Sequence, residues 1–265
     1  MQSSFRLFDK SFQAVRQSSF RLFDKSSFQN CSARTVKLIK QTTLGSPVET
    51  DGVGLHTGVE VKVRLLPAPP DTGYVFRRTD LGGFEIPATV ESVAHCGYAT
   101  TLMRTGVMLS TVEHLLAALR GANVDNVFIE VDNLEIPILD GSAEVFTDMI
   151  GRAGVVAQPL ARRALLVRER ISFEQGNRRI SVEPADNYEI DCLIDFPHPL
   201  IRVQQFSLQL TNGSFSREIA AARTFGFTEE IEALQRSNLI RGGFPIISNW
   251  KQTTGRFCSG MFRPF

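Results

Sequence analysis

The amino-acid sequence predicts an α+β fold arranged in two halves. Strand-like alternation comes first and helix-like periodicity later, this order is repeated once, and the periodic pattern ceases after Gly243. Strands and helices that segregate in this way are typical of α+β domains, whereas alternating β-α-β units would indicate a parallel sheet. The 265 residues suffice for one large domain or two small ones, because a domain usually has roughly 100–200 residues.

The composition argues against several classes of protein. The net charge is +1, whereas a nucleic-acid-binding protein usually has a strong basic excess, so we expect no nucleic acid as a partner. No apolar stretch approaches the ~20 residues that span a bilayer, and we expect no transmembrane segment. The four cysteines are scattered and form no CxxC or disulfide-like pattern, which indicates a reducing compartment. They are Cys31, Cys96, Cys192 and Cys258.

Residues 1–35 differ from the rest of the chain. The peptide QSSFRLFDK occurs at Gln2–Lys10 and again at Gln17–Lys25. The stretch is rich in Ser and Phe, carries Arg and Lys, and has few acids, which is the composition of an organellar transit peptide. We therefore predict a transit peptide, with the mitochondrion as its destination and the plastid as the alternative. A disordered extension with a functionless duplication is the other interpretation.

Residues 36–156 are predicted to form the first α+β domain. Alternating apolar positions in VEVKVRLLPA and NVFIEVD predict half-buried strands, and LGGFEIPATV predicts a turn followed by a strand. One helix is expected in STVEHLLAALRGA, where apolar side chains form a single stripe, and another in SAEVFTDMIGRAG; a Gly marks the end of each. Residues 157–164, with the sequence AQPLARRA, are predicted to be the linker.

Residues 165–243 are predicted to form the second α+β domain. They begin with a hairpin that turns at Gln175–Asn177, and YEIDCLIDF predicts a further strand. SREIAAARTF and TEEIEALQRSNLIRGG predict helical segments, with Ser216 and Thr228 as their N-caps. Residues 244–265 have no sustained period and are predicted to be an aberrant tail.

Glu113 and His114 lie in the first turn of the first predicted helix, and two interpretations of them are open. A hydrolytic zinc site needs three protein ligands, an open position for water and a carboxylate that takes the proton of that water. Glu113 and His114 could supply this carboxylate and one ligand, although the second His of an HExxH motif is missing. Alternatively, Ser110-x-x-Glu113 fits a capping box, in which Glu113 bonds the amide of Ser110 and His114 is a surface residue.

Three further stretches contain candidate residues. The glycines of GVGLHTG, residues 52–58, would let a ligand approach the chain near His56, or they form a turn with a chance His. EIPILDGSA, residues 135–143, is interpreted as a structural turn that leads into a helix. AARTFGF, residues 221–227, places Thr224 and an aromatic pair where they could line a pocket or fill one.

Together and in this order, GVGLHTG, RRTDL, STVEHLLAAL, DNVFIEVDNLEIPILDGSA and ARTFGF resemble one family, the zinc-dependent UDP-3-O-acyl-N-acetylglucosamine deacetylases of lipid A biosynthesis. The resemblance runs from about Val36 to Gly243, and with its leader the chain is similar to the plant, mitochondrially targeted form. It implies two similar domains, each a small sheet packed on helices, with the active site between them. It also implies that the substrate is an acylated UDP-sugar lipid precursor, and we expect a monomer.

The resemblance assigns catalytic roles to three residues. His114 would be a zinc ligand and Glu113 the general base that deprotonates the zinc-bound water. The hydroxyl of Thr224 would help to stabilise the tetrahedral oxyanion. The reaction would be hydrolysis of the 2-acetamido group, which releases acetate and a free amine.

The resemblance also assigns substrate-binding roles. His56 would lie near the substrate and Phe225 beside its sugar. Phe227 and Ile231 would lie near the hydrophobic passage that takes the acyl chain.

The sequence departs from the family pattern at Phe244. The family's His-Lys-x-x-Asp motif, which carries the other two zinc ligands, has no counterpart here, nor has the later His that acts as general acid; no His follows His198. We therefore expect the second domain to be incomplete and the zinc site to lack two of its three protein ligands. Two functions remain open: the deacetylation typical of the family, and a catalytically inactive truncated relative that acts as a binding or interaction protein.

Overall fold

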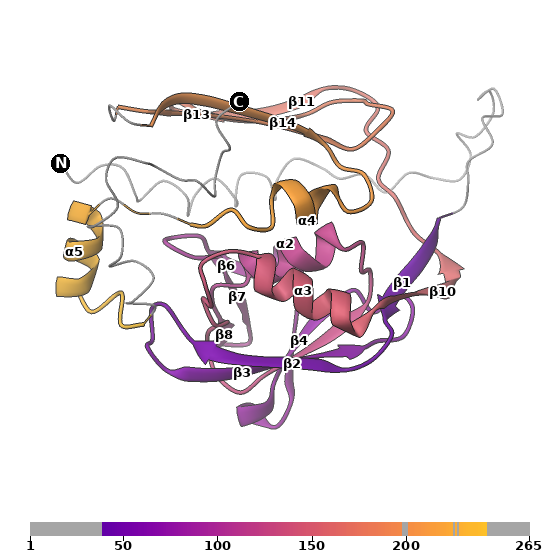
Figure 1. The fold of residues 1–265 in the computed structure, drawn as a ribbon, viewed down its shortest axis with the longest axis horizontal. Helices are drawn as coiled ribbons and strands as arrows, with labels where there is room; N and C mark the ends of the chain where they lie inside the picture. The colour runs from indigo at the N-terminus through magenta and orange to yellow at the C-terminus, as the bar shows by residue number, and fades with distance from the viewer. Residues whose placement is uncertain (1–38, 198–200, 225, 227, 243–265) are drawn as a thin grey trace.

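The computed structural model describes residues 39–197, 201–224, 226 and 228–242. The predicted leader and tail lie outside this part of the chain, as do Phe225 and Phe227. Three layers are visible in Figure 1: one large sheet, a layer of helices, and hairpins on the far side of those helices. This mixture of small sheets and few helices confirms the predicted α+β class. Within the described ranges, no helix is both long and apolar enough to cross a membrane.

The largest sheet has five strands in the order β2-β3-β9-β4-β5. Their bounds are β2 Val48–Val53, β3 Glu60–Pro67, β9 Val127–Val131, β4 Tyr74–Arg78 and β5 Phe84–Pro87. All neighbours are antiparallel except β4 and β9, which are parallel. The alternation that predicted these strands is confirmed, because Val61, Val63 and Leu65 of β3 are buried while the residues between them are exposed.

Two smaller sheets complete the strands of the first half. Strands β6 Val93–His95, β7 Thr101–Arg104 and β8 Val107–Leu109 form one of them, and short 3-10 turns lie at Thr79–Leu81 and Val90–Ser92. Strand β1 Lys40–Leu44 pairs with β10 Val155–Ala161 in the other. The predicted linker at 157–164 therefore begins inside a strand, and the exposed connection starts only after Ala161.

The RRTDL motif ties the five-stranded sheet to β8. The guanidinium of Arg78, which is 7% exposed, donates to both carboxylate oxygens of Asp80 at 2.8 and 2.6 Å and to the carbonyl of Met108 at 2.7 Å. These hydrogen bonds from Arg78 hold the pKa of Asp80 below its usual value. A guanidinium that is paired with a carboxylate and further hydrogen-bonded can remain buried at acceptable cost, so this motif is structural.

Four helices are described: α2 Glu113–Gly121, α3 Glu144–Ala153, α4 Ser214–Glu218 and α5 Thr228–Arg236. The apolar stripes of α2 and α3 face the five-stranded sheet, and Leu115, Leu119 and Phe146 are completely buried. Helix α4 is shorter than expected, and its N-cap is Gly213, so the prediction of Ser216 at this position is wrong.

The second half is packed less densely than the first. Its strands form two separate hairpins, β11 Ile171–Gln175 with β12 Arg178–Val182, and β13 Glu189–Phe196 with β14 Arg202–Gln209. The predicted turn at Gln175–Asn177 is confirmed, with Gly176 at positive φ. Ile180 is 71% exposed and Leu193 64%. A lone two-stranded hairpin is marginally stable, so these hairpins depend on packing contacts with the rest of the chain.

Helix α4 joins the two halves through one aromatic side chain. Phe215 is 7% exposed and belongs to the same core cluster as Leu115 and Phe146 of the first half. Its ring lies directly against Gly121, where a Cβ atom would collide with it. The absence of a side chain at Gly121 therefore allows α4 to approach the end of α2.

We predict that Gly121→Ala and Gly151→Ala have opposite effects, although both glycines lie in helices. Ala favours a helix by about 1 kcal/mol over Gly, and nothing lies within 4 Å of a Cβ added to Gly151, so Gly151→Ala should raise the free energy of unfolding by about that amount. Gly121→Ala should lower it by about 1–3 kcal/mol because the new methyl group overpacks the Phe215 ring. Urea unfolding measures both, and a stabilised Gly121→Ala would contradict this packing.

We also predict that trypsin first separates the two halves between residues 162 and 170, where Leu165 and Leu166 are 90% and 79% exposed. The two fragments should nevertheless elute together in size-exclusion chromatography, because Phe215 remains buried in the first half. In Phe215→Ala the nicked fragments should separate. Earlier cleavage within the five-stranded sheet, or separation of the nicked wild-type fragments, would refute this prediction.

Candidate active site

Glu113 and His114 begin helix α2, and both are half-buried. The capping box proposed from the sequence is absent here: the N-cap position is Val112, and the amide of Ser110 donates to the carbonyl of Leu134 at 2.9 Å. Glu113 instead accepts a hydrogen bond at Oε2 from the backbone amide of Thr100, at 3.0 Å. The carboxylate is thus held against the loop between β6 and β7 and does not cap its own helix.

The chain enters α2 through a strained residue. Thr111 has a φ of 60°, which is a genuine outlier for a β-branched side chain and costs about 1–3 kcal/mol. Thr111 is 3% exposed, and its hydroxyl donates to Glu135 Oε1 at 3.1 Å. Such strain persists only where surrounding contacts compensate for it, and the buried hydrogen bond to Glu135 is one such contact.

The glycine-rich stretch at residues 52–58 leaves strand β2 after Val53 and forms a tight loop in which the amide of Gly58 donates to the carbonyl of Gly54 at 3.0 Å. Gly58 has a φ of 68°, a conformation that favours glycine. Gly54 is required for a different reason: a Cβ atom there would collide with the carboxylate of Glu135 and the hydroxyl of Thr57. The close approach that these glycines allow is therefore an approach of the protein's own carboxylate.

Glu135 lies behind this loop and is only 1% exposed. Its Oε1 accepts from the amide of His56 at 2.9 Å, and its Oε2 accepts from the amide of Thr57 at 2.8 Å. Together with the hydroxyl of Thr111, it therefore has three neutral donors. Glu135 is the first residue of the EIPILDGSA motif, but the sequence alone indicates no role for it. It lies in an irregular segment, where no periodicity predicts which way a side chain points.

The remaining loop contacts come from the end of the described chain. The amides of Arg241 and Gly242 both donate to the carbonyl of Leu55 at 3.0 Å. His56 Nδ1 lies 2.7 Å from the carbonyl of Leu239, and because a carbonyl can only accept, Nδ1 carries the hydrogen. Nε2 of His56 is buried and has no hydrogen-bond partner within the described residues. A neutral His56 thus presents an unused acceptor beside the candidate site.

Thr224 is brought to the turn at the start of α3. Its amide donates to the carbonyl of Gly141 at 2.9 Å. The side chain of the neighbouring Arg223 forms an ion pair with Asp140, with 3.6 Å between the guanidinium nitrogen and Oδ2. The side chain of Thr224 is exposed. Ile231, one of the two predicted acyl-passage residues, lies half-buried in α5 and close to Gly226. The other, Phe227, lies outside the described residues, as does Phe225, which is predicted to lie beside the sugar.

A single segment, residues 134–143, connects these candidate residues. The amide of Ile136 donates to the carbonyl of Ser110 at 3.0 Å and that of Ile138 to the carbonyl of Val53 at 3.1 Å. At its far end lie Gly141, bonded to Thr224, and Ala143, whose amide donates to Ala220. The structure therefore brings the loop of His56, the start of α2 and Thr224 to one segment.

Across residues 39–197, 201–224, 226 and 228–242, no three His, Cys, Asp or Glu side chains come together as a metal site requires. A zinc ion in a hydrolytic site takes three protein ligands, and His114 alone does not meet that requirement. The donor set of the described residues therefore does not fit zinc. His95 is exposed and Cys96 half-buried on the loop next to Thr100.

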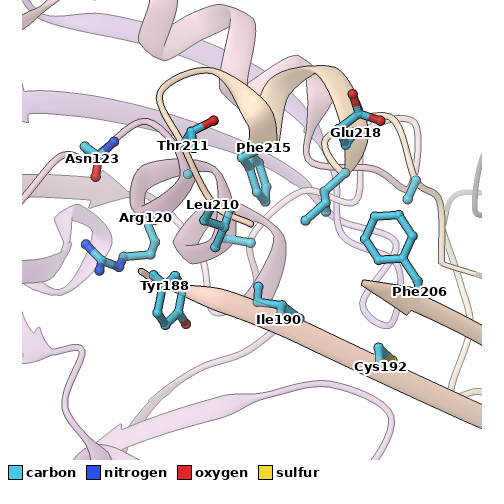
Figure 2. A pocket seen from close by; sticks show the side chains of 14 residues that line it. Arg120, Asn123, Tyr188, Ile190, Cys192, Phe206, Leu210, Thr211, Phe215 and Glu218 are labelled. Carbon is cyan, nitrogen blue, oxygen red and sulfur yellow. The ribbon is translucent and has the colours of Figure 1, made fainter. Parts of the chain in front are cut away.

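A cavity of about 480 Å³ lies beyond the other end of α2, between Arg120 and the hairpin of β13 and β14 (Figure 2). Its lining is mainly apolar and includes Tyr188, Ile190, Phe206 and Phe215. Of the predicted site residues, none that the structure describes lines it. It marks instead the incomplete packing of the hairpin on the helices.

The α+β fold, together with the Glu–His pair at a strained helix start, is compatible with a hydrolase. Residues 41–246 match the family described as LpxC, UDP-3-O-acyl N-acetylglycosamine deacetylase. The chain belongs to this family.

Three bacterial relatives, each named UDP-3-O-acyl-N-acetylglucosamine deacetylase, show the extent of the similarity. The chain is 47% identical over 202 residues to that of Solibacter usitatus, covering 76% of this chain and 68% of the relative. It is 46% identical over 204 residues to that of Myxococcus xanthus, covering 77% and 65%. It is 43% identical over 209 residues to that of Cellvibrio japonicus, covering 78% and 69%. The match thus spans about two thirds of each relative and confirms the family that the motifs indicate.

We predict that the hydroxyl of Thr111 stabilises the site. Thr111→Val keeps the branched shape and its backbone strain but leaves Glu135 with one donor fewer, which should lower the free energy of unfolding by about 1–3 kcal/mol. Thr111→Ser keeps the hydroxyl and should cost about 0.8 kcal/mol for the lost methyl group. Urea unfolding of both variants tests this prediction, and a Ser variant as unstable as the Val variant would disprove it.

Proposed function

We propose that this chain takes part in the hydrolytic deacetylation of UDP-3-O-acyl-N-acetylglucosamine, in lipid A-type biosynthesis. The observation that carries the proposal is the position of Glu113 and His114 at the start of α2, within a chain that belongs to the deacetylase family. The strained entry through Thr111 and the buried contact with Glu135 support it, because such strain is typical of functional sites.

In this proposal, Glu113 takes a proton from the water that attacks the amide carbonyl of the 2-acetamido group. The carbonyl carbon becomes tetrahedral, and the hydroxyl of Thr224 donates a hydrogen bond to the oxygen that gains negative charge. Glu113 then returns this proton to the nitrogen as the C–N bond breaks, so that acetic acid and the free amine form, and the acid loses its own proton to give acetate. His56 would lie near the substrate and Phe225 beside its sugar. Phe227 and Ile231 would lie near the hydrophobic passage that takes the acyl chain.

The zinc dependence of this chain is a proposal that rests on the family resemblance alone. His114 would be one ligand, and zinc would supply Lewis-acid activation of the water and the carbonyl. The donor set of the described residues does not fit zinc. The same observation favours a second candidate function, binding of the acylated UDP-sugar without hydrolysis.

We propose further that the chain is a plant member of the family, acts as a monomer, and is directed to mitochondria by residues 1–35. The basic, Ser-rich and acid-poor composition of this leader supports the destination. A reporter fused to residues 1–35 should be imported into mitochondria, whereas import into plastids would support the alternative and a cytosolic reporter would reject both.

We predict that Glu113→Gln lowers the rate of deacetylation of the UDP-sugar substrate by about 10²–10⁴-fold, the range expected for loss of a general base. Glu144→Gln is the matched control, because Glu144 is the first residue of α3 as Glu113 is of α2, yet it is exposed and outside the site. It should leave the rate unchanged. Binding of the substrate without measurable turnover in the wild-type protein would favour the second candidate function.

We predict that the purified and dialysed chain holds well below one zinc per molecule, because one imidazole cannot retain the ion against chelators. Elemental analysis measures the ratio. A ratio near one that is lost in His114→Ala would refute this prediction and would point to replacement ligands such as His95 or Cys96.

A further inference from the structure

A buried carboxylate whose donors within the described residues are all neutral is an unusual feature of this molecule. Glu135 is 1% exposed and lies close to two backbone amides and one hydroxyl, those of His56, Thr57 and Thr111. Its two oxygens serve as acceptors in all three contacts. Removing a carboxylate from water is costly unless it is paired and hydrogen-bonded. A side chain retained at such a cost, and satisfied by donors from two segments, requires an explanation beyond filling space.

Glu135 joins the glycine-rich loop that contains His56 to the start of helix α2. In the loop it accepts hydrogen bonds from the consecutive amides of His56 and Thr57, and the ring of His56 has no partner for Nε2 within the described residues. On the other side it holds the strained Thr111, two residues before Glu113. Gly54 leaves room for this arrangement, since any Cβ there would collide with the carboxylate.

We propose that Glu135 is a positioning residue that sets the geometry of His56 relative to Glu113 and His114. Its carboxylate fixes the loop through Oε1 and Oε2 and fixes the start of α2 through Oε1. Glu135 does not touch the reacting atoms and acts through the residues that it holds. The expected effect of Glu135 on the reaction rate rests on the proposed deacetylase function. Its expected effect on the structure of the loop does not.

The geometry also specifies what a substitution would disturb. Glutamine has the same shape but can offer an acceptor on one side only, so its NH₂ group must face a donor on the other side. If the amide oxygen accepts from His56 and Thr111, the NH₂ group faces the amide of Thr57. Glu135→Gln should therefore loosen part of the loop, and Glu135→Ala should release both segments.

Another buried polar residue provides a matched control. Asn126 is 2% exposed; its Nδ2 donates to Gln41 and Gln158 at 2.9 and 2.7 Å, and its Oδ1 accepts from the amide of Gly73. These contacts are near the β1 and β10 pair and involve none of the candidate site residues. Asn126→Ala should destabilise the fold without moving the site.

The first measurement is amide hydrogen exchange on the full chain, in peptides that cover residues 52–59. Exchange there should become about tenfold faster or more in Glu135→Gln, because the amide of Thr57 loses its buried acceptor. In Asn126→Ala, exchange of the same peptides should be unchanged when the two variants are compared at equal free energy of unfolding. Unchanged exchange in Glu135→Gln, or an equal increase in both variants, would overturn the proposal.

The second measurement is the steady-state deacetylation of the UDP-sugar substrate. Misplacement of a site by about 1 Å costs about 10²-fold, so kcat/KM should fall by up to that factor in Glu135→Ala and by less in Glu135→Gln. Both kcat and KM should change, because Glu135 holds the substrate loop and the catalytic helix together, whereas Asn126→Ala should change neither. Wild-type kinetics in a folded Glu135→Gln would overturn the proposal.

The two measurements separate failure of this inference from failure of the proposed function. If the wild-type chain shows no turnover, the proposed deacetylation fails, and exchange alone decides whether Glu135 holds the loop. If Glu135→Ala does not fold, Glu135→Gln still gives both readouts.

Discussion

The irregular segment from Leu134 to Ala143 is the constraint on which the rest of the candidate site depends. Its backbone groups have no regular ladder to satisfy them, and buried amides and carbonyls must find partners. They pair instead with Ser110, with Val53 and with Thr224, three positions far apart in the sequence. Displacing this segment would break hydrogen bonds to all three at once. The geometry of the site is therefore a property of this segment more than of any single helix or strand.

The two halves of the chain contribute unequally to the free energy of folding. The first half buries a continuous apolar cluster between its sheet and its helices, and each large side chain removed from water there contributes about 1.5–3 kcal/mol. In the second half, the hairpins leave residues such as Ile180 and Leu193 in solvent and enclose a cavity beside α2. Its main described contribution to the core is Phe215. The second half is thus held in place largely by the first, and this contact is specific because it requires a glycine at position 121.

The sequence sufficed where local periodicity determines the structure. Alternation predicted β3 and β9, and the hairpin turn was located at Gln175–Asn177, because one buried face fixes the spacing of apolar residues. It failed where a distant partner competes with a local one. Ser110 and Glu113 have the spacing of a capping box. However, the amide of Ser110 donates to the carbonyl of Leu134, and the carboxylate of Glu113 accepts from the amide of Thr100. The position of Glu135 behind the glycine loop could not be predicted, since no period connects residues 54, 111 and 135.

Contacts between distant residues also explain why the second half, although less densely packed, matters to the site. The glycine loop is held on one side by Glu135 and on the other by Leu239, Arg241 and Gly242. The contact with Leu239 places a hydrogen of His56 on Nδ1, and in the neutral imidazole this leaves Nε2 as an acceptor. If the end of the second half moved away, the loop would keep its contacts with Glu135, but His56 would be free to rotate and to exchange its tautomer. The first half therefore sets where His56 lies, and the second half sets which chemistry its ring presents.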